Sequence, residues 1–159
     1  MAYNWGSSTN TEEAEKIKKI LVAVSGNTSD EDAVTFACIL AKRSHAEISV
    51  IYIIEVKRSL PIDAVIKSDL NKAEKILTRA EDIAADNDFE IKTDVLQSRE
   101  AGVAIVDSAV EKDIDLILMG LDYKKRFGMF HLGDVIPYVL EEAPCRVLLI
   151  RRPAGKGKK

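Results

Sequence analysis

Residues 115–151 read DLILMGLDYKKRFGMFHLGDVIPYVLEEAPCRVLLIR and contain two apolar runs, separated by a long loop and a helical pattern. The runs at 115–120 and 145–151 are nearly continuous in apolar residues and as long as a typical strand, which indicates parallel strands covered on both faces. Between them, Val135, Ile136, Val139 and Leu140 recur with helical spacing. Strand, helix and strand in this order predict a right-handed crossover between parallel strands.

The same alternation fills the chain before residue 115. Strand-length, β-branched runs occur at 17–25, 46–56 and 88–97, and the last alternates polar with apolar residues, as edge strands do. The helical stripes between them are Ala33, Phe36, Ala37, Leu40 and Ala41, after a Thr28-x-x-Glu31 capping box; Ile66, Leu70, Ala73, Leu77, Ala80 and Ala84; and Val103, Val106, Ala109 and Val110, with Ser98 as a candidate N-cap. The pattern predicts an α/β fold, an open doubly wound five-stranded parallel sheet with helices on both faces.

One domain is expected at 17–152, between a polar tail or linker at 1–16 and a basic tail at 153–159. A net charge of −3 does not favour nucleic acid as a partner. No apolar run approaches the about 18–20 residues that span a bilayer. Cys38 and Cys145 match no metal or redox spacing, which is typical of a reducing cytoplasm, and Cys38 is expected to pack as a small hydrophobe.

Ligands of such sheets bind beyond the carboxyl ends of the strands, where the strand order reverses. The loops to search are therefore SGNTSDE (25–31), EVKRSLPID (55–63) and GLDYKKRFGMFHLGD (120–134). Residues 56–64, which include Pro61 and two cations of the middle loop, fit neither strand nor helix and are expected to form an irregular surface loop. The third holds three consecutive cations, Lys124, Lys125 and Arg126, which would favour an anion or simply form a solvated basic turn.

Over residues 17–151 the chain resembles the universal stress protein family. The stretches that carry the likeness are KKILVAVSGN, AEISVIYIIE, DLILMG, the loop ending in LGD, and VLEEAPCRVLLIR. The resemblance implies the fold of the adenine nucleotide alpha hydrolase group and a sensor or regulatory domain that is not an enzyme. It also implies a cytoplasmic homodimer paired through its last strand, around Val147 and Leu149. The ligand it implies is ATP, AMP or another adenine nucleotide, with Mg²⁺ if a triphosphate binds.

The family's nucleotide-binding members carry a motif of three glycines followed by Ser or Thr, and this chain matches it in part. The first and last glycines correspond to Gly120 and Gly133, whereas the middle glycine is Tyr123 and the closing hydroxyl is Asp134. An Asp that the family tends to place after the first strand is Ser25 here. A carboxylate cannot donate to a phosphate oxygen and would repel it, so ATP binding is doubtful and the pocket is expected to be degenerate. Asp134 would equally serve as an N-terminal residue of the last helix.

The residues expected at the nucleotide are Ala23, Ser25, Ile53 and Met119 around adenine, and Gly120, Tyr123, Lys124, Arg126, Gly133, Asp134 and Val135 near the phosphates. No metal ligands and no catalytic residues are predicted, because the sequence has neither a nucleophile elbow nor a P-loop.

Three further interpretations stay open. Residues 97–151 also resemble universal-stress-type domains appended to amino-acid permeases and other membrane transporters, which would make this a membrane-associated regulatory domain. An enzyme of the same fold group would hydrolyse nucleotides or transfer nucleotidyl groups. An interaction domain would keep an empty pocket.

Overall fold

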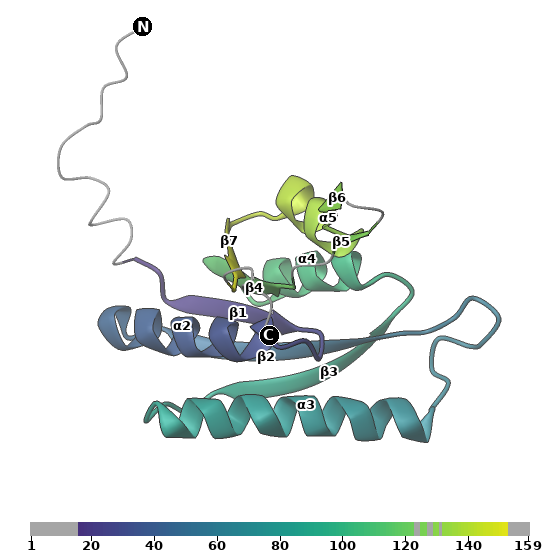
Figure 1. The fold of residues 1–159 in the computed structure, drawn as a ribbon, viewed down its shortest axis with the longest axis horizontal. Helices are drawn as coiled ribbons and strands as arrows, with labels where there is room; N and C mark the ends of the chain where they lie inside the picture. Colours follow the sequence, from purple (N-terminus) through teal and green to yellow (C-terminus); the bar gives the residue numbers. More distant parts are fainter. Residues whose placement is uncertain (1–15, 123–124, 127–128, 131, 153–159) are drawn as a thin grey trace, which may run out of the picture.

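The computed structural model describes residues 16–122, 125–126, 129–130 and 132–152. Five parallel strands form one sheet in the order β3-β2-β1-β4-β7 (Figure 1). Their bounds are β1 Lys19–Val24, β2 Glu47–Glu55, β3 Lys92–Ser98, β4 Leu116–Leu121 and β7 Arg146–Arg151. All five correspond to the predicted strand runs, with ends shifted by a few residues, and the alternating run became the edge strand β3.

Helices cover both faces of the sheet (Figure 1). Helices α2 (Ser29–Ser44) and α3 (Lys67–Asp86) enclose one core cluster with β1, β2 and β4, whereas α4 (Ala101–Glu111) and α5 (Val135–Glu142) enclose another on the opposite face. The strands between these layers are buried on both sides: Leu21, Val22, Ile117 and Leu118 are each 0% exposed. This double burial explains why the central strands are apolar without alternation, and the predicted architecture is confirmed.

Strand β1 pairs with β2 on one side and with β4 on the other. The chain runs outward from β1 to β2 and β3, then returns to place β4 and β7 on the other side. The strand order therefore reverses between β1 and β4. The loops that leave the carboxyl ends of these strands diverge there and open a crevice for a ligand.

The helices bury somewhat different stripes from those predicted. Phe36, Ile66, Leu70, Val110 and Leu140 were expected on the buried faces but are 38–58% exposed. The remaining space under α2 is filled by Val34 and Cys38, both 0% exposed, and burial raises the pKa of the Cys38 thiol. Cys38 thus packs as the predicted small hydrophobe. The stripes differ because helical periodicity gives a spacing but not the width of the contact that each helix makes.

The capping-box contacts predicted for α2 and the N-cap predicted for α4 are wrong. Thr28 occupies the N-cap position of α2, but its side chain makes no cap hydrogen bond, and Glu31 instead pairs with Arg79 across to α3. The N-cap residue of α4 is Glu100 rather than Ser98, whose hydroxyl interacts with the backbone of Glu100 in a local turn.

The loops differ in how regular they are. Residues 56–66 contain neither helix nor strand, as predicted. The loop after β4 holds a feature that the sequence did not predict, a short antiparallel pair of β5 (Lys125–Arg126) with β6 (Met129–Phe130).

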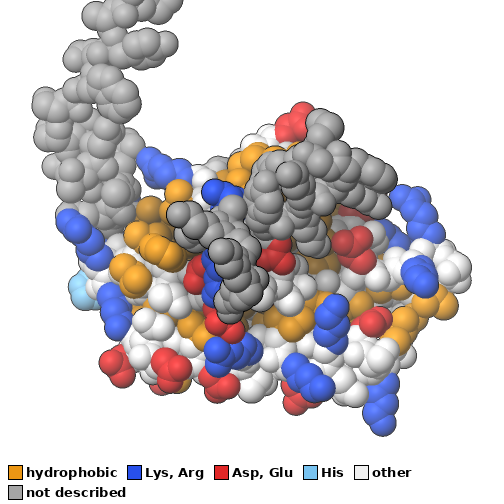
Figure 2. All heavy atoms as spheres, viewed as in Figure 1, with side chains coloured by type: hydrophobic (Ala, Val, Ile, Leu, Met, Phe, Trp, Pro, Cys, Tyr) orange, Lys and Arg blue, Asp and Glu red, His pale blue; other side chains and the backbone are white. Residues whose placement is uncertain are grey.

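Acidic and basic side chains are interspersed over α2 and α3, on the lower part of the surface in Figure 2. Within the described ranges, the helices are too short or too polar to cross a membrane.

Candidate functional site

A cleft of about 690 Å³ lies at the carboxyl ends of the central strands, where the strand order reverses. Its walls come from the ends of β1, β2 and β4 and from the first residues of α4 and α5. The lining residues are Ala23, Val24, Ser25, Asn27, Tyr52, Ile53, Glu55, Ala101, Ile105, Met119, Gly120, Leu121, Asp122, Leu132, Gly133, Asp134, Val135 and Ile136. The volume lies within the range of small-molecule pockets.

The structure brings most of the predicted site residues together in this cleft. Its lining includes the whole expected adenine set, Ala23, Ser25, Ile53 and Met119, and four of the expected phosphate set, Gly120, Gly133, Asp134 and Val135. Tyr123 and Lys124 lie outside the described residues. Arg126 is placed only through its backbone, in β5.

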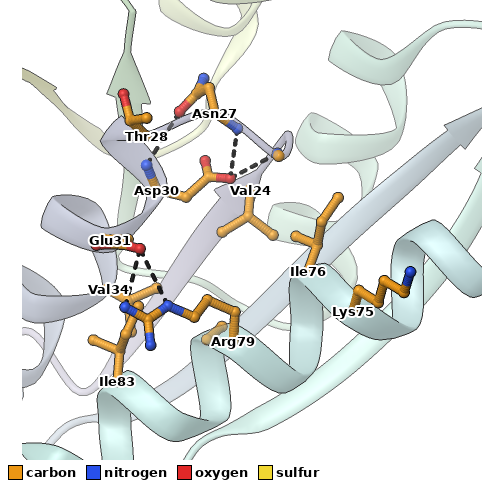
Figure 3. A pocket seen from close by; sticks show the side chains of 12 residues that line it. Val24, Asn27, Thr28, Asp30, Glu31, Val34, Lys75, Ile76, Arg79 and Ile83 are labelled. Atoms are coloured by element: carbon orange, nitrogen blue, oxygen red, sulfur yellow. Dashed lines mark hydrogen bonds and ion pairs between the residues drawn. The ribbon is translucent and has the colours of Figure 1, made fainter.

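The loop after β1 closes on the carboxylate of Asp30. The backbone N–H groups of Ser25, Gly26 and Asn27 all donate to this carboxylate, at 3.2, 2.6 and 3.1 Å. Figure 3 shows the bond from Asn27. Gly26 permits the turn because its φ is +90°, a conformation that residues with a Cβ rarely adopt. The loop therefore forms a backbone anion site, and the chain fills it with its own carboxylate.

Asp30 is only 9% exposed, and its environment acts on its ionisation in two directions. Burial raises the pKa of Asp30, the three backbone N–H donors lower it, and the nearby charge of Asp122 raises it again. Burial is the largest of these effects, so the pKa lies above the usual 3.8.

The loops after β1 and β4 are joined through Ser29, the first residue of α2. The Ser29 hydroxyl lies 2.9 Å from both the backbone oxygen of Leu121 and the carboxylate of Asp122, and donates to these acceptors. The Thr28 hydroxyl donates to the same carboxylate at 3.4 Å. Asp122 is therefore held at the N-terminus of α2, where the helix dipole favours a negative charge.

Gly120 lies where α2 crosses the end of β4. A Cβ placed on Gly120 would come within 2.5 Å of the backbone oxygen of Ser29. The absence of a side chain at this position is thus required by helix packing, whatever the cleft binds.

Gly133 and Asp134 form the entry to α5. Gly133 has a φ of +73°, which again favours glycine. Asp134 occupies the N-cap position, as the sequence suggested, but its exposed side chain makes no cap hydrogen bond.

A second, smaller hollow of about 300 Å³ lies on the other side of the β1 loop, between α2 and α3 (Figure 3). It shares Val24 and Asn27 with the main cleft. The Arg79 guanidinium in its wall lies 3.1 Å from the Glu31 carboxylate, so this cation is already paired with an acidic side chain.

The end of β7 is fixed to the same region. Arg152 donates to the Asp32 carboxylate at 2.6 and 3.2 Å and lies 3.8 Å from that of Glu31. These contacts join the last described residue of the chain to the first turn of α2 and raise the pKa of Arg152.

The comparison with known families decides what kind of domain this is. Residues 16–151 match the model of the universal stress protein family. The chain belongs to this family. A universal stress protein of Methanocaldococcus jannaschii is 30% identical over 142 residues, which cover 86% of this chain and 83% of the relative.

Solved universal stress proteins have the same fold. The protein from Archaeoglobus fulgidus in complex with dAMP gives a TM-score of 0.68 at 24% identity, covering 83% of this chain and 96% of that one. A family member from Arabidopsis thaliana with AMP bound gives 0.63 at 16% identity, covering 86% and 93%. At these identities the likeness carries the fold and not the ligand.

Sequence reasoning about this universal stress protein missed the carboxylates of Asp30, Asp122 and Glu55. Asp122 had a signal, since it lies between the first glycine of the family motif and Tyr123. Asp30 had none, because an acidic residue in the first turn of a helix is ordinary and gives no sign that a loop folds over it. In the part of the chain that the structure describes, no three His, Cys, Asp or Glu side chains are grouped to hold a metal ion.

Proposed function

We propose that this universal stress protein is a regulatory domain that binds an adenine nucleoside or nucleotide in the cleft between β1 and β4 and does not turn it over. The observation that carries the proposal is the convergence, in one cleft at the reversal of strand order, of both predicted sets of site residues. The adenine set and the described part of the phosphate set come from four separate segments, so only the fold brings them together.

The chemistry of the lining suits a nucleoside. Ala23, Ile53 and Met119 supply apolar surface for a flat base, while Ser25 and Glu55 supply polar groups for the hydroxyls of a sugar. The dAMP and AMP complexes of the Archaeoglobus and Arabidopsis proteins support an adenine ligand, because a shared fold places ligands at the same strand ends.

The way in which the polar groups are engaged supports binding without turnover. Asp30, the buried carboxylate closest to the β1 loop, accepts three backbone N–H groups, and the Ser29 hydroxyl is directed at acceptors of the β4 loop. Groups held in this way stabilise the loops and are poorly placed to exchange protons with a substrate.

Calorimetric titration with adenosine, AMP and guanosine tests the proposal. We expect the adenine compounds to bind and guanosine to bind much more weakly. Ala23→Leu, which fills the cleft beside the base, should reduce adenine binding by more than tenfold, about 1.4 kcal/mol. The same change at Ala85, an exposed position on α3, is the matched control and should have no effect.

Two results would contradict the proposal. The first is the absence of binding by any adenine compound, which would favour an interaction domain. The second is steady release of phosphate from ATP by the purified protein, which would identify an enzyme.

A further inference from the structure

The cleft borders three places that would attract a phosphate group. One is the turn of backbone N–H groups at Ser25–Asn27, and the others are the N-termini of α2 and α5. What occupies these places sets the number of phosphate groups that a bound nucleotide can carry.

The first place is filled by Asp30, whose carboxylate accepts the three N–H groups of the turn. An incoming phosphate would have to displace a side chain that is covalently tethered and 9% exposed. The donors of this loop are therefore already used within the protein.

The second place is filled by Asp122. Its carboxylate is held 2.9 Å from the Ser29 hydroxyl and 3.4 Å from that of Thr28, at the start of α2. The first turn of α2 also holds Asp30, Glu31 and Asp32. Glu31 and Asp32 are paired with Arg79 and Arg152, so the charge of Asp122 adds chiefly to that of Asp30. A phosphate there would face carboxylates in place of donors.

All charged side chains in the described lining of the cleft are negative. Its charged side chains are the carboxylates of Glu55, Asp122 and Asp134, with no Lys or Arg among the described lining residues. Each phosphate beyond the first adds negative charge next to these groups, and the repulsion between charges in a partly enclosed cleft is weakly screened.

We infer that the cleft selects adenine ligands with at most one phosphate group and discriminates against ATP, with Asp122 as a residue that determines this specificity. The inference rests on the proposed function and deepens it. A single phosphate would lie at the entry to α5, where the N-cap residue Asp134 is exposed and makes no cap hydrogen bond, whereas a triphosphate would extend the charge toward the carboxylates of Glu55 and Asp122.

Titration of the purified protein with AMP and ATP tests the inference, once with EDTA and once with Mg²⁺. We expect ATP to bind about tenfold more weakly than AMP in both conditions. ATP binding as tightly as AMP in either condition would overturn the inference and leave the proposed function standing. Such a result is expected if the cations at 124–126 bind the phosphate groups of ATP and offset the repulsion from the carboxylates. Failure of both ligands to bind would overturn the proposed function as well.

The variant Asp122→Asn tests the assigned residue. The amide keeps an oxygen that can accept from Ser29 while removing the charge, so we expect the affinity for ATP to rise about fivefold and that for AMP to change less than twofold. Asp63→Asn removes the same charge from the exposed 56–66 loop, outside the cleft, and should change neither affinity. An unchanged ratio of ATP to AMP affinity in Asp122→Asn, with an unchanged melting temperature, would overturn the role of Asp122.

Discussion

Asp30 is the residue on which the geometry of the β1 loop depends. Its carboxylate replaces water as the acceptor for three consecutive N–H groups, and this fixes the backbone of Ser25, Gly26 and Asn27 beside the cleft. A hydrogen bond to a charged group contributes about 1.5–3 kcal/mol, and a buried donor left without an acceptor costs a similar amount.

Replacement of Asp30 by Ala should therefore lower the free energy of unfolding by about 2–3 kcal/mol, because the three N–H groups lose their acceptor and only some of them reach water. Urea unfolding measures the effect. The matched change Asp63→Ala, at an exposed loop position, should stay within about 0.5 kcal/mol of the parent protein. Equal stability of the two variants would show that water replaces the carboxylate without cost.

Asp30 also predicts a pH dependence. Its pKa is raised in the folded protein, chiefly by burial, so the unfolded chain loses the proton first as the pH rises. The stabilising contribution of the protonated carboxyl is complete below the usual pKa of 3.8 and is lost as the pH passes through the raised folded value. Asp30→Asn cannot ionise, so its stability relative to the parent should increase from pH 4 toward neutrality.

Urea unfolding of both proteins at a series of pH values measures this difference. If the stability of Asp30→Asn relative to the parent fell as the pH rose, the three N–H groups would affect the pKa of Asp30 more strongly than burial does. The pKa of Asp30 would then be lowered in the folded protein.

Among the elements, α2 and β4 approach each other closely at Gly120, beside the backbone of Ser29. Gly120→Ala should cost about 3 kcal/mol of stability, because the added methyl group meets the backbone of Ser29 and no side-chain rotation can relieve it. Gly133→Ala is the control: a Cβ there meets open space, and only the positive φ of +73° opposes it, at about 1 kcal/mol. Thermal unfolding of both variants checks the order.

A Gly120→Ala variant as stable as Gly133→Ala would mean that α2 moves away from β4 easily. The packing requirement at Gly120 would then be weak.

The elements themselves could be predicted well from the sequence. Doubly buried strands leave a clear signal, since Leu21, Ile117 and their neighbours must be apolar whichever face they point to. Helix faces were predicted less well: Phe36 and Leu140 fit the period but lie at the margins of the contact. The predicted capping box at the start of α2 failed because Thr28, an acceptable cap by type, uses its hydroxyl to reach Asp122 in another loop.

The position of the cleft could be predicted because the backbone brings its residues together. The hydrogen bonds between its side chains could not be predicted. Strand order alone places Ala23, Ile53 and Met119 near the carboxyl ends of neighbouring strands, so the position of the cleft follows from topology. The pairing of Asp122 with Ser29 spans 93 positions of sequence. Such a contact depends on where the start of α2 crosses the end of β4, which residue pattern does not specify.

At the scale of the whole molecule, the two edges of the sheet differ. Strand β3 is an edge strand whose exposed side chains are polar: Lys92, Asp94 and Gln97. Strand β7 is the opposite edge and is far more apolar, with Leu148 44% exposed. Among the described residues, no further strand pairs with the outer edge of β7. An apolar edge strand of this kind favours pairing with another chain.

We therefore expect an isologous homodimer that pairs through β7, with Val147, Leu149 and the exposed Leu148 at the seam. Light scattering at tens of micromolar should give twice the mass of the chain. Leu148→Glu should weaken association more than tenfold, about 1.4 kcal/mol, because two charges would be buried against each other across the twofold axis. Val110→Glu places the same charge on a 58% exposed valine of α4, away from the edge, and should leave the dimer intact. A monomeric parent protein would show that this interface does not form. Equal dissociation constants for both variants would show that the dimer does not pair through β7.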